Sequence, residues 1–293
     1  SIILLIAVLF TEPINEVKRW LSFGPISFQP SELAKFAVVF HFATLLVRKE
    51  EDIKDFNKGF LPFLLWLGVI CFLIAMQPNL STTLVIYVIG LIIMFIGNTN
   101  LLHLFATGLV SVLAGILYFT QVSGYQINRI LAFFGDPTEV SSDHNVNYQL
   151  NQALIALGNG GIFGVGPGQS SQSNLYLPES YGDFIYSIIG EEYGFIGAVA
   201  IIGLFVLIFW RGMLVAKRAP DKFGYYLAVG ILITFSVYVF VNAGVNCGLL
   251  PTTGLPMPFI SYGGTAVLFY SAATGILLNI SAQAGTFSYG DES

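Results

Sequence analysis

The strongest constraint on the fold is a series of apolar runs, each about 20 residues long, that recurs through the whole sequence. An α-helix of that length crosses the roughly 30 Å hydrocarbon core of a bilayer. Only 10% of the residues are charged, whereas a soluble domain carries about 25%. A transmembrane β-barrel would show alternating segments of about ten residues, and the sequence has none. We therefore predict an all-α polytopic membrane protein.

The apolar runs predict a single transmembrane domain over residues 1–293, with about seven whole spans and one partial span. The whole spans are expected near residues 31–47, 59–76, 80–97, 101–119, 184–210, 223–248 and 261–281. Residues 1–10 open without a Met, a basic segment or a cleavage site, so we expect them to end a span whose beginning is missing. Residues 11–30 are read as a polar, aromatic linker. Residues 120–182 are too long for a plain connector, and we expect a large external loop with short helices there.

The distribution of Lys and Arg predicts the orientation of these spans. Alternation of sides places loops 48–58, 98–100 and 211–222 together, and they hold eight of the twelve basic residues. The opposite side holds Lys18, Arg19 and Arg129. The basic loops are therefore expected in the cytoplasm, and segments 120–183 and 249–263 together on the outer side.

The overall charge, the cysteines and the histidines give no sign of nucleic-acid binding, a disulfide or a metal site. A net charge of −5 gives no electrostatic footprint for nucleic acid. Cys71 and Cys247 both fall in apolar runs, so we read them as small buried hydrophobic residues and not as a disulfide. His41, His103 and His144 are scattered without metal-ligand spacing, and no metal-binding residues are predicted.

A glycine-rich stretch is the most unusual local feature, with six glycines between residues 158 and 168. Such a stretch can present backbone N–H groups to an anion, or it can allow tight turns and close helix contact. Neither a G-x-G-x-x-G register nor a terminal Gly-Lys-Ser/Thr is present, so we do not predict a nucleotide site. No Lys or Arg lies between Arg129 and Arg211, whereas seven acids do.

Asp183 is the best candidate for a catalytic group, because it stands at the edge of a long apolar run. Burial at the membrane edge and the nearby Glu179 would both raise its pKa, which suits a general base. The alternative is that Asp183 caps the helix that follows it. Glu191 and Glu192 lie two turns further in, and we expect at least one of them to pair with a base or a hydroxyl. Ser261 has no His or Asp grouping nearby, so a serine nucleophile is not supported.

Lys35 is the best cationic candidate. Ser31 is expected to cap its helix, and Glu32 lies three residues before Lys35 on the same face. A Lys near the end of a span can extend to the interface. Two interpretations stay open. Lys35 forms a structural pair with Glu32, or Lys35, together with Arg129, contacts an anionic group of the substrate.

Four stretches together resemble the SEDS family, which comprises FtsW, RodA and SpoVE. They are Lys18-Arg19-Trp20 with GPISFQPSELAK (24–35), GNGGIFGVGPGQS (158–170), LPESYGDFIYSIIGEEYGFIG (177–197) and GLLPTTGLPMPFISYGG (248–264). The resemblance extends over essentially the whole chain, and Gly190-Glu191-Glu192 is more similar to the FtsW branch than to RodA.

The resemblance implies a bundle of ten spans, of which the first two are absent from this sequence. It implies polymerisation of lipid II into glycan strands at the outer face of the bacterial cytoplasmic membrane, with release of undecaprenyl pyrophosphate. A class B penicillin-binding protein and the division or elongation machinery are the implied partners. The acid that the family requires falls on Asp183, and its charged pair falls on Glu32 and Lys35. Asn79 stands where many members have Asp, which puts a metal or proton role at that position in doubt.

The implied reaction is one displacement with inversion, for which a single carboxylate base suffices. The diphosphate that leaves requires a counter-charge, from Lys35, Arg129 or a divalent cation such as Mg²⁺. We therefore assign catalysis to Asp183. Substrate binding is assigned to Lys35, Glu32, Arg129, Glu179 and Ser261.

Two other classes of function remain open. A transporter of lipid-linked precursor would show interrupted helices in both halves, and the sequence offers no matching interruption. A non-catalytic scaffold of the division machinery is the third possibility, and Asn79 is the residue that favours it.

Overall fold

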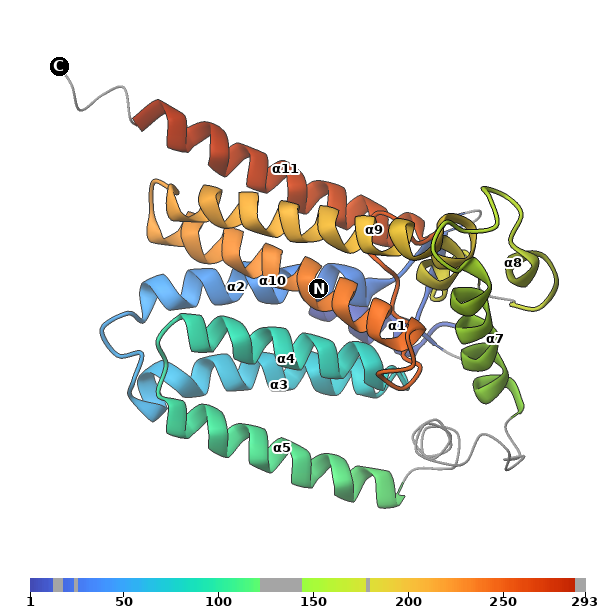
Figure 1. Cartoon of the computed structure of the whole chain (residues 1–293). Helices are drawn as coiled ribbons and strands as arrows, with labels where there is room; N and C mark the ends of the chain where they lie inside the picture. Colours follow the sequence, from blue (N-terminus) through green and yellow to red (C-terminus); the bar gives the residue numbers. More distant parts are fainter. Residues whose placement is uncertain (13–17, 24–25, 122–143, 178–179, 288–293) are drawn as a thin grey trace. The chain divides into compact units, whose positions relative to one another are not determined.

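The structure is a computed structural model of the chain, and it describes residues 1–12, 18–23, 26–121, 144–177 and 180–287. The chain forms two compact units. Unit 1 comprises residues 1–106, 208–237 and 264–293, and unit 2 comprises residues 107–207 and 238–263. The elements are α1 (Ile2–Leu9), β1 (Leu21–Phe23), β2 (Ile26–Phe28), α2 (Pro30–Arg48), the π-helix η1 (Phe56–Phe60), α3 (Leu61–Ala75), α4 (Leu80–Ile96), α5 (Leu101–Gln121), α7 (His144–Gly160), α8 (Ser171–Leu175), α9 (Ile185–Lys217), α10 (Lys222–Asn246) and α11 (Gly264–Phe287) (Figure 1).

The helices confirm the predicted membrane architecture. Five helical segments of the described chain are long and apolar enough to cross a bilayer, namely Pro30–Arg48, Phe56–Ala75, Ile185–Lys217, Lys222–Asn246 and Gly264–Ala284. The shorter apolar helices Leu80–Ile96 and Leu101–Gly115 bring these to the predicted seven. The eight-residue α1 corresponds to the partial span. The chain is therefore a multi-pass helical membrane protein.

Helix α2 is the central helix of unit 1, where it packs against α1, α3, α4 and α11. Its N-cap is Gln29, two residues before the predicted Ser31, and Pro30 occupies the first turn, where a missing N–H costs nothing. The expectation that Ser31 caps this helix was wrong, since its hydroxyl is buried and bonds to no backbone amide at the helix start. Gly90 of α4 faces Leu67 of α3, and a Cβ at position 90 would lie 2.8 Å from the end of that side chain.

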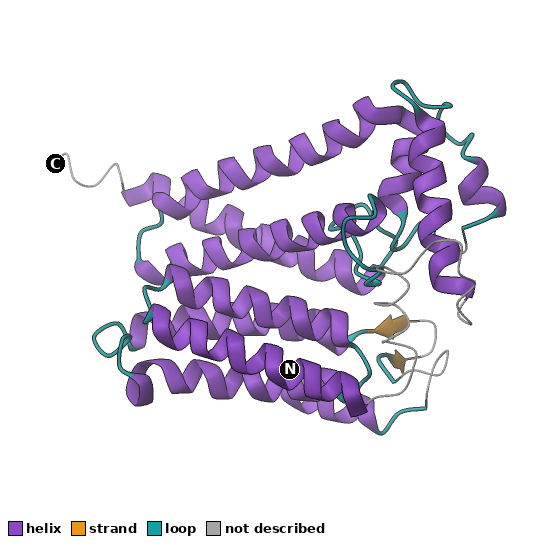
Figure 2. Cartoon of the chain, turned by 60° about the horizontal axis from the view of Figure 1, so that its bottom comes forward, coloured by secondary structure: helices purple, strands orange, loops and turns teal. Residues whose placement is uncertain are grey.

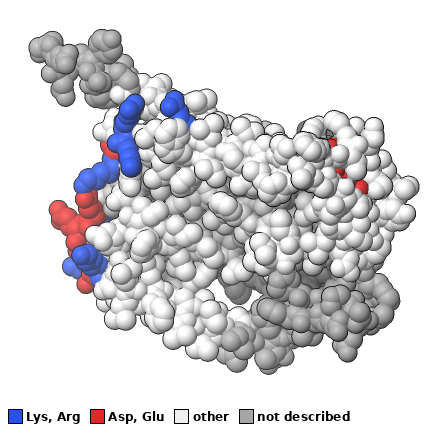
Figure 3. Space-filling view, in the orientation of Figure 1, with Lys and Arg blue, Asp and Glu red and all other residues white. Residues whose placement is uncertain are grey.

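The basic loops of unit 1 lie at one end of its helices, as the alternation of spans predicted. Figure 3 shows this concentration of Lys, Arg, Asp and Glu on the left of the molecule. Lys222, at the start of α10, forms an ion pair with Glu50, in the loop after α2. The loops that follow α2 and α9 therefore share one side.

A β-hairpin precedes α2, and so lies at the end opposite to the loop that follows it. The strands β1 and β2 pair antiparallel, with Leu21 opposite Phe28 (Figure 2). The hydroxyl of Thr265, at the start of α11, donates to the backbone carbonyl of Ser27 over 3.0 Å. The sequence had been read as a linker here, so this hairpin was not predicted.

Unit 2 contains the glycine-rich stretch, and its core forms around the beginning of α9. One cluster of buried side chains joins α7, α9 and α10 and consists of Ala153, Leu177, Phe184, Ile188 and Val245. Within the 120–182 segment, the described residues form the 17-residue α7 and the five-residue α8. Cys247 of this unit is exposed, so its interpretation as a buried residue was wrong; Cys71 is partly buried, and both thiols are free.

Candidate active site

Asp183 lies two residues before α9, and its backbone is held by side chains from α10. Its carbonyl oxygen accepts hydrogen bonds from the side-chain amides of Asn242 at 2.9 Å and Asn246 at 3.0 Å. Asn246 also uses its Oδ1 to accept from the amide of Ser187 at 3.0 Å. Asn246 of α10 therefore contacts both the carbonyl of Asp183 and the first turn of α9 at Ser187.

The carboxylate of Asp183 is half-buried and lines a small pocket with a volume of about 30 Å³. That volume accommodates one water-sized group, such as a hydroxyl. The pocket lining is mostly polar and consists of Gln149, Asp183, Phe184, Asn242, Val245, Thr252, Thr253, Gly254 and Leu255.

Gly254 has no side chain, and the Asp183 carboxylate lies close to its backbone. A Cβ at Gly254 would lie 3.3 Å from Oδ2 of Asp183, and the backbone there has φ of +71°. Any side chain would therefore be strained in its backbone and would press on the carboxylate. The backbone conformation at residue 254 and the position of the Asp183 carboxylate both favour glycine at 254.

The segment 249–263 is bonded directly to the residues before α9. The Ser261 hydroxyl donates to the carbonyl of Gly182 over 2.7 Å and accepts from the amide of Met257 over 2.7 Å. The amide of Tyr262 donates to the carbonyl of Tyr181 over 2.8 Å. These contacts confirm the prediction that the two segments lie on one side. Ser261 is only 4% exposed, and its hydroxyl proton is donated to the residue that precedes Asp183.

The glycine-rich stretch bonds to backbone groups of α9 at the point where that helix is interrupted. Gly194 has φ of +68° and breaks the helix, which leaves backbone groups on either side of it without intrahelical partners. The amides of Val165 and Gly166 donate to the carbonyls of Glu191 and Glu192 at 2.9 and 3.0 Å.

In return, the amide of Phe195 donates to the carbonyl of Gly161 at 2.9 Å. Irregular backbone at membrane depth requires such partners. The stretch therefore serves close backbone contact, which was one of the two predicted uses, and the amides of Val165 and Gly166 are bonded to carbonyls of α9.

Glu191 fastens the same stretch through its side chain, which is only 1% exposed. Its carboxylate accepts from the hydroxyls of Ser170 and of Ser171, the latter at 3.0 Å, and from the amide of Gln172 at 3.3 Å. The amide of Asn159 approaches at 3.5 Å. This confirms that one of the two glutamates pairs with hydroxyls.

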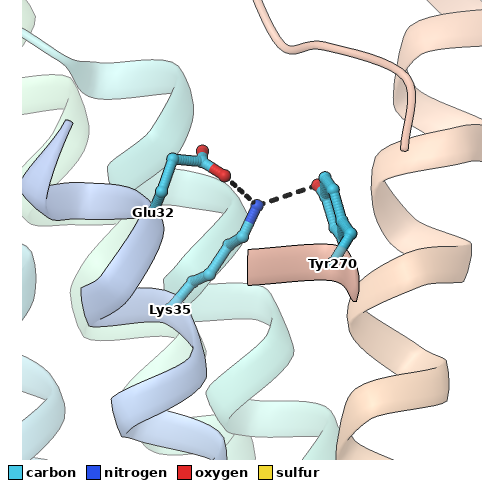
Figure 4. Close-up of polar contacts among 3 residues, drawn as sticks. All are labelled: Glu32, Lys35 and Tyr270. Carbon is cyan, nitrogen blue, oxygen red and sulfur yellow. Dashed lines mark hydrogen bonds and ion pairs between the residues drawn. The ribbon is translucent and has the colours of Figure 1, made fainter. Parts of the chain in front are cut away.

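Lys35 and Glu32 form a buried ion pair in unit 1 (Figure 4). The Nζ atom of Lys35 donates to Glu32 Oε2 over 2.6 Å and to the hydroxyl of Tyr270, on α11, over 2.8 Å. It also lies 4.0 Å from the centre of the Tyr270 ring, a favourable cation–π contact. Lys35 is 1% exposed, so its ammonium is enclosed by protein within unit 1.

Two assigned residues, Arg129 and Glu179, lie outside the described residues. Among the described residues, no group of three or more His, Cys, Asp or Glu side chains could hold a metal ion. His41 packs on Trp66, and His103 packs on Phe56 and Phe60, as expected of structural histidines.

Comparison with known proteins places this geometry in a family. The model of the family described as "Cell cycle protein", FtsW/RodA/SpoVE, matches residues 1–286. The chain belongs to the FtsW/RodA/SpoVE family. A relative from Geobacter sp. (strain M18), "Probable peptidoglycan glycosyltransferase FtsW", is 40% identical over 90% of this chain and 71% of its own length. "Stage V sporulation protein E" of Bacillus subtilis is 39% identical over 91% of this chain and 72% of its own length.

Solved structures agree with the family. The structure titled "Structural coordination of polymerization and crosslinking by a peptidoglycan synthase complex" matches with a TM-score of 0.80 and 25% identity, over 97% of this chain and 79% of that one. The rod shape determining protein RodA of Thermus thermophilus matches with a TM-score of 0.65 and 24% identity, over 97% of this chain and 75% of that one. The second match shows the fold alone.

Within this FtsW/RodA/SpoVE member, Asn79 has a structural task. Its side chain accepts from the amide of Thr82 over 3.4 Å and caps α4. Arg19 lies beside the same turn, where its guanidinium donates to the carbonyls of Gln77, at 3.3 Å, and Pro78. Because the side chain of Asn79 makes this cap, the start of α4 does not require a carboxylate.

The residues that sequence reasoning missed are Asn242 and Asn246. Both are buried, at 1% and 0% exposure, in a helix that is otherwise largely apolar. Two amides spaced four residues apart in a span share one helix face and must find hydrogen-bond partners inside the protein. That spacing was the available signal.

Proposed function

We propose that the protein polymerises lipid II into glycan strands as a peptidoglycan glycosyltransferase. The observation that carries the proposal is a half-buried carboxylate, Asp183, that lines a pocket of hydroxyl size in a member of this family. The names of the relatives at 39–40% identity support the same activity.

In the proposed reaction, Asp183 is the general base. The 4-hydroxyl of the acceptor sugar gives its proton to the Asp183 carboxylate as its oxygen attacks C1 of the donor sugar. The bond from C1 to the diphosphate oxygen breaks, and the electron pair leaves with undecaprenyl diphosphate. One displacement converts the α-linked donor into a β-1,4 linkage. The diphosphate is a good leaving group, so a second carboxyl group as general acid is unnecessary.

The departing diphosphate requires positive charge, and we propose Lys35 and Arg129 as its source. In the structure the Lys35 ammonium donates to Glu32 and to the hydroxyl of Tyr270. Engagement of a phosphate would replace one of these contacts. The described residues provide no multi-ligand metal site, so we derive no step through Mg²⁺ or another cation.

We further propose that the protein works in the bacterial cytoplasmic membrane with its active site facing outward. The concentration of basic residues in the loops after α2 and α9 supports a cytoplasmic location for those loops. The solved peptidoglycan synthase complex supports a partner that crosslinks the strands, for which a class B penicillin-binding protein is the candidate.

Labelled lipid II tests the proposal against the two rival functions. The full-length protein is purified in detergent with any partner that accompanies it, reconstituted into vesicles and supplied with labelled lipid II. Glycan product is the expected result. Transfer of lipid II between leaflets without product would establish a transporter, and neither activity would establish a scaffold. The transporter is disfavoured by the helices themselves, since α9 is broken at Gly194 and no second described span has a matching break.

A further inference from the structure

The backbone around Asp183 is immobilised on both sides of its Cα atom. A residue has two soft backbone dihedrals, and each is fixed when the adjoining peptide plane is fixed. The peptide before Asp183 is held through the Gly182 carbonyl, which accepts from Ser261 at 2.7 Å. The peptide after Asp183 is held through its own carbonyl, which accepts from Asn242 and Asn246. The backbone conformation at Asp183 is therefore held from both sides.

The two asparagine amides use all their N–H groups in this arrangement. Asn242 donates to Asp183 and, over 2.8 Å, to the carbonyl of Leu255. Asn246 donates to Asp183 and, over 2.9 Å, to the carbonyl of Asn242. A single side chain, Asn242, therefore joins the peptide at 183 to the segment that carries Gly254, against which the carboxylate lies.

The side chains of Asn242 and Asn246 are buried, so their amides depend on hydrogen-bond partners inside the protein. An amide left unpaired in an apolar environment is costly, which favours retention of these hydrogen bonds of Asn242 and Asn246. Rotation of the peptide after Asp183 would break the two hydrogen bonds that its carbonyl accepts from Asn242 and Asn246. The direction in which the carboxylate leaves the backbone is thereby set from α10.

We propose that Asn242 and Asn246 are positioning residues that fix the carboxylate of Asp183 for proton abstraction. The proposal rests on the proposed function, because it gives Asp183 the role of base. It assigns a catalytic consequence to two residues that touch no substrate. Displacement of a catalytic group by about 1 Å can cost about 10²-fold in rate.

Asn242→Leu tests the proposal, because it removes both donated bonds and keeps the number and branching of the side-chain heavy atoms. We expect kcat for lipid II polymerisation to fall about 10- to 100-fold, with KM within about twofold of the parent. Thr234→Val is the matched control: Thr234 lies on the same helix, is fully buried and donates only to the carbonyl of Gly230 in its own helix. That control should keep the parent rate.

The deciding measurement repeats Asn242→Leu in an Asp183→Asn background. If the asparagine acts through Asp183, the second substitution causes no further loss of the residual rate. An equal loss in both backgrounds, or an unchanged kcat in the parent background, would overturn the proposal. Polymerisation at the parent rate by Asp183→Asn alone would instead remove Asp183 as the base, which is a failure of the proposed function and is seen without any asparagine variant.

Ser187→Ala provides a milder variant in case Asn242→Leu does not fold. It removes the hydroxyl that donates to Asn246 Oδ1 over 2.7 Å, while the amide of Ser187 still donates there. We expect a loss in kcat of about 2- to 10-fold, again absent in the Asp183→Asn background. A loss that persists in that background would contradict the proposal.

Discussion

Removal of the Lys35 charge should destabilise the protein strongly, because it leaves Glu32 buried without a counter-charge. Glu32 is 3% exposed, and in Lys35→Met its carboxylate loses the 2.6 Å bond from the ammonium. The ammonium contacts to the hydroxyl and ring of Tyr270 are lost as well. Breaking a buried ion pair from one side costs about 3–5 kcal/mol, and we expect Lys35→Met to lose that much stability.

The double variant Glu32→Leu/Lys35→Met separates structure from function. Replacing both members of a buried pair with apolar residues is often neutral or stabilising, so the double variant should recover most of the lost stability. We expect that it nevertheless polymerises little lipid II, because the proposed counter-charge for the diphosphate is gone.

Thermal unfolding in detergent and lipid II polymerisation are measured on the parent, the single variant and the double variant. The ion pair of Lys222 and Glu50 is a matched control, since its side chains are 62% and 53% exposed. Glu50→Gln should therefore leave the thermal midpoint essentially unchanged. A stable double variant that polymerises at the parent rate would refute the substrate role of Lys35 and leave the pair purely structural.

Two further predictions concern the break in α9. Gly194→Ala should destabilise the protein and lower its thermal midpoint, because a Cβ there would lie 2.4 Å from the amide nitrogen of Gly164 and the φ of +68° is strained for Ala. An unchanged midpoint would show that the interruption is not required. Glu191→Gln should cost about 1–3 kcal/mol of stability, because hydrogen bonds from two serines lose their charged acceptor and the new amide N–H₂ faces donors; proteolysis of the 158–172 segment would report the loosening, and an unchanged cleavage rate would contradict it.

The membrane architecture was predictable because span length and hydropathy are local properties of the sequence. The seven spans appear near their predicted positions, and the ion pair between Lys222 and Glu50 confirms that two basic loops share one side. The hairpin of residues 21–28 was missed because its strands are only three residues long. The dipeptide Gly24-Pro25 was its one turn signal.

The candidate site was only partly predictable, because its contacts join residues that are far apart in sequence. Asp183 was identified from its position at the edge of an apolar run, but its anchors lie 59 and 63 residues later, at Asn242 and Asn246. The glycine count could not distinguish an anion site from backbone contact, since either use requires the same residue type. The structure favours backbone contact, because the amides of Val165 and Gly166 are bonded to α9.

The central claim is that the carboxylate at position 183 removes the proton from the acceptor hydroxyl. Its most direct test is the polymerisation rate of Asp183→Asn on labelled lipid II, with Glu51→Gln, an exposed acid in the loop after α2, as the control for charge. We predict that Asp183→Asn folds as the parent does and polymerises about 10²- to 10⁴-fold more slowly, while the control is unaffected. A folded Asp183→Asn variant with a near-normal rate would contradict the mechanism.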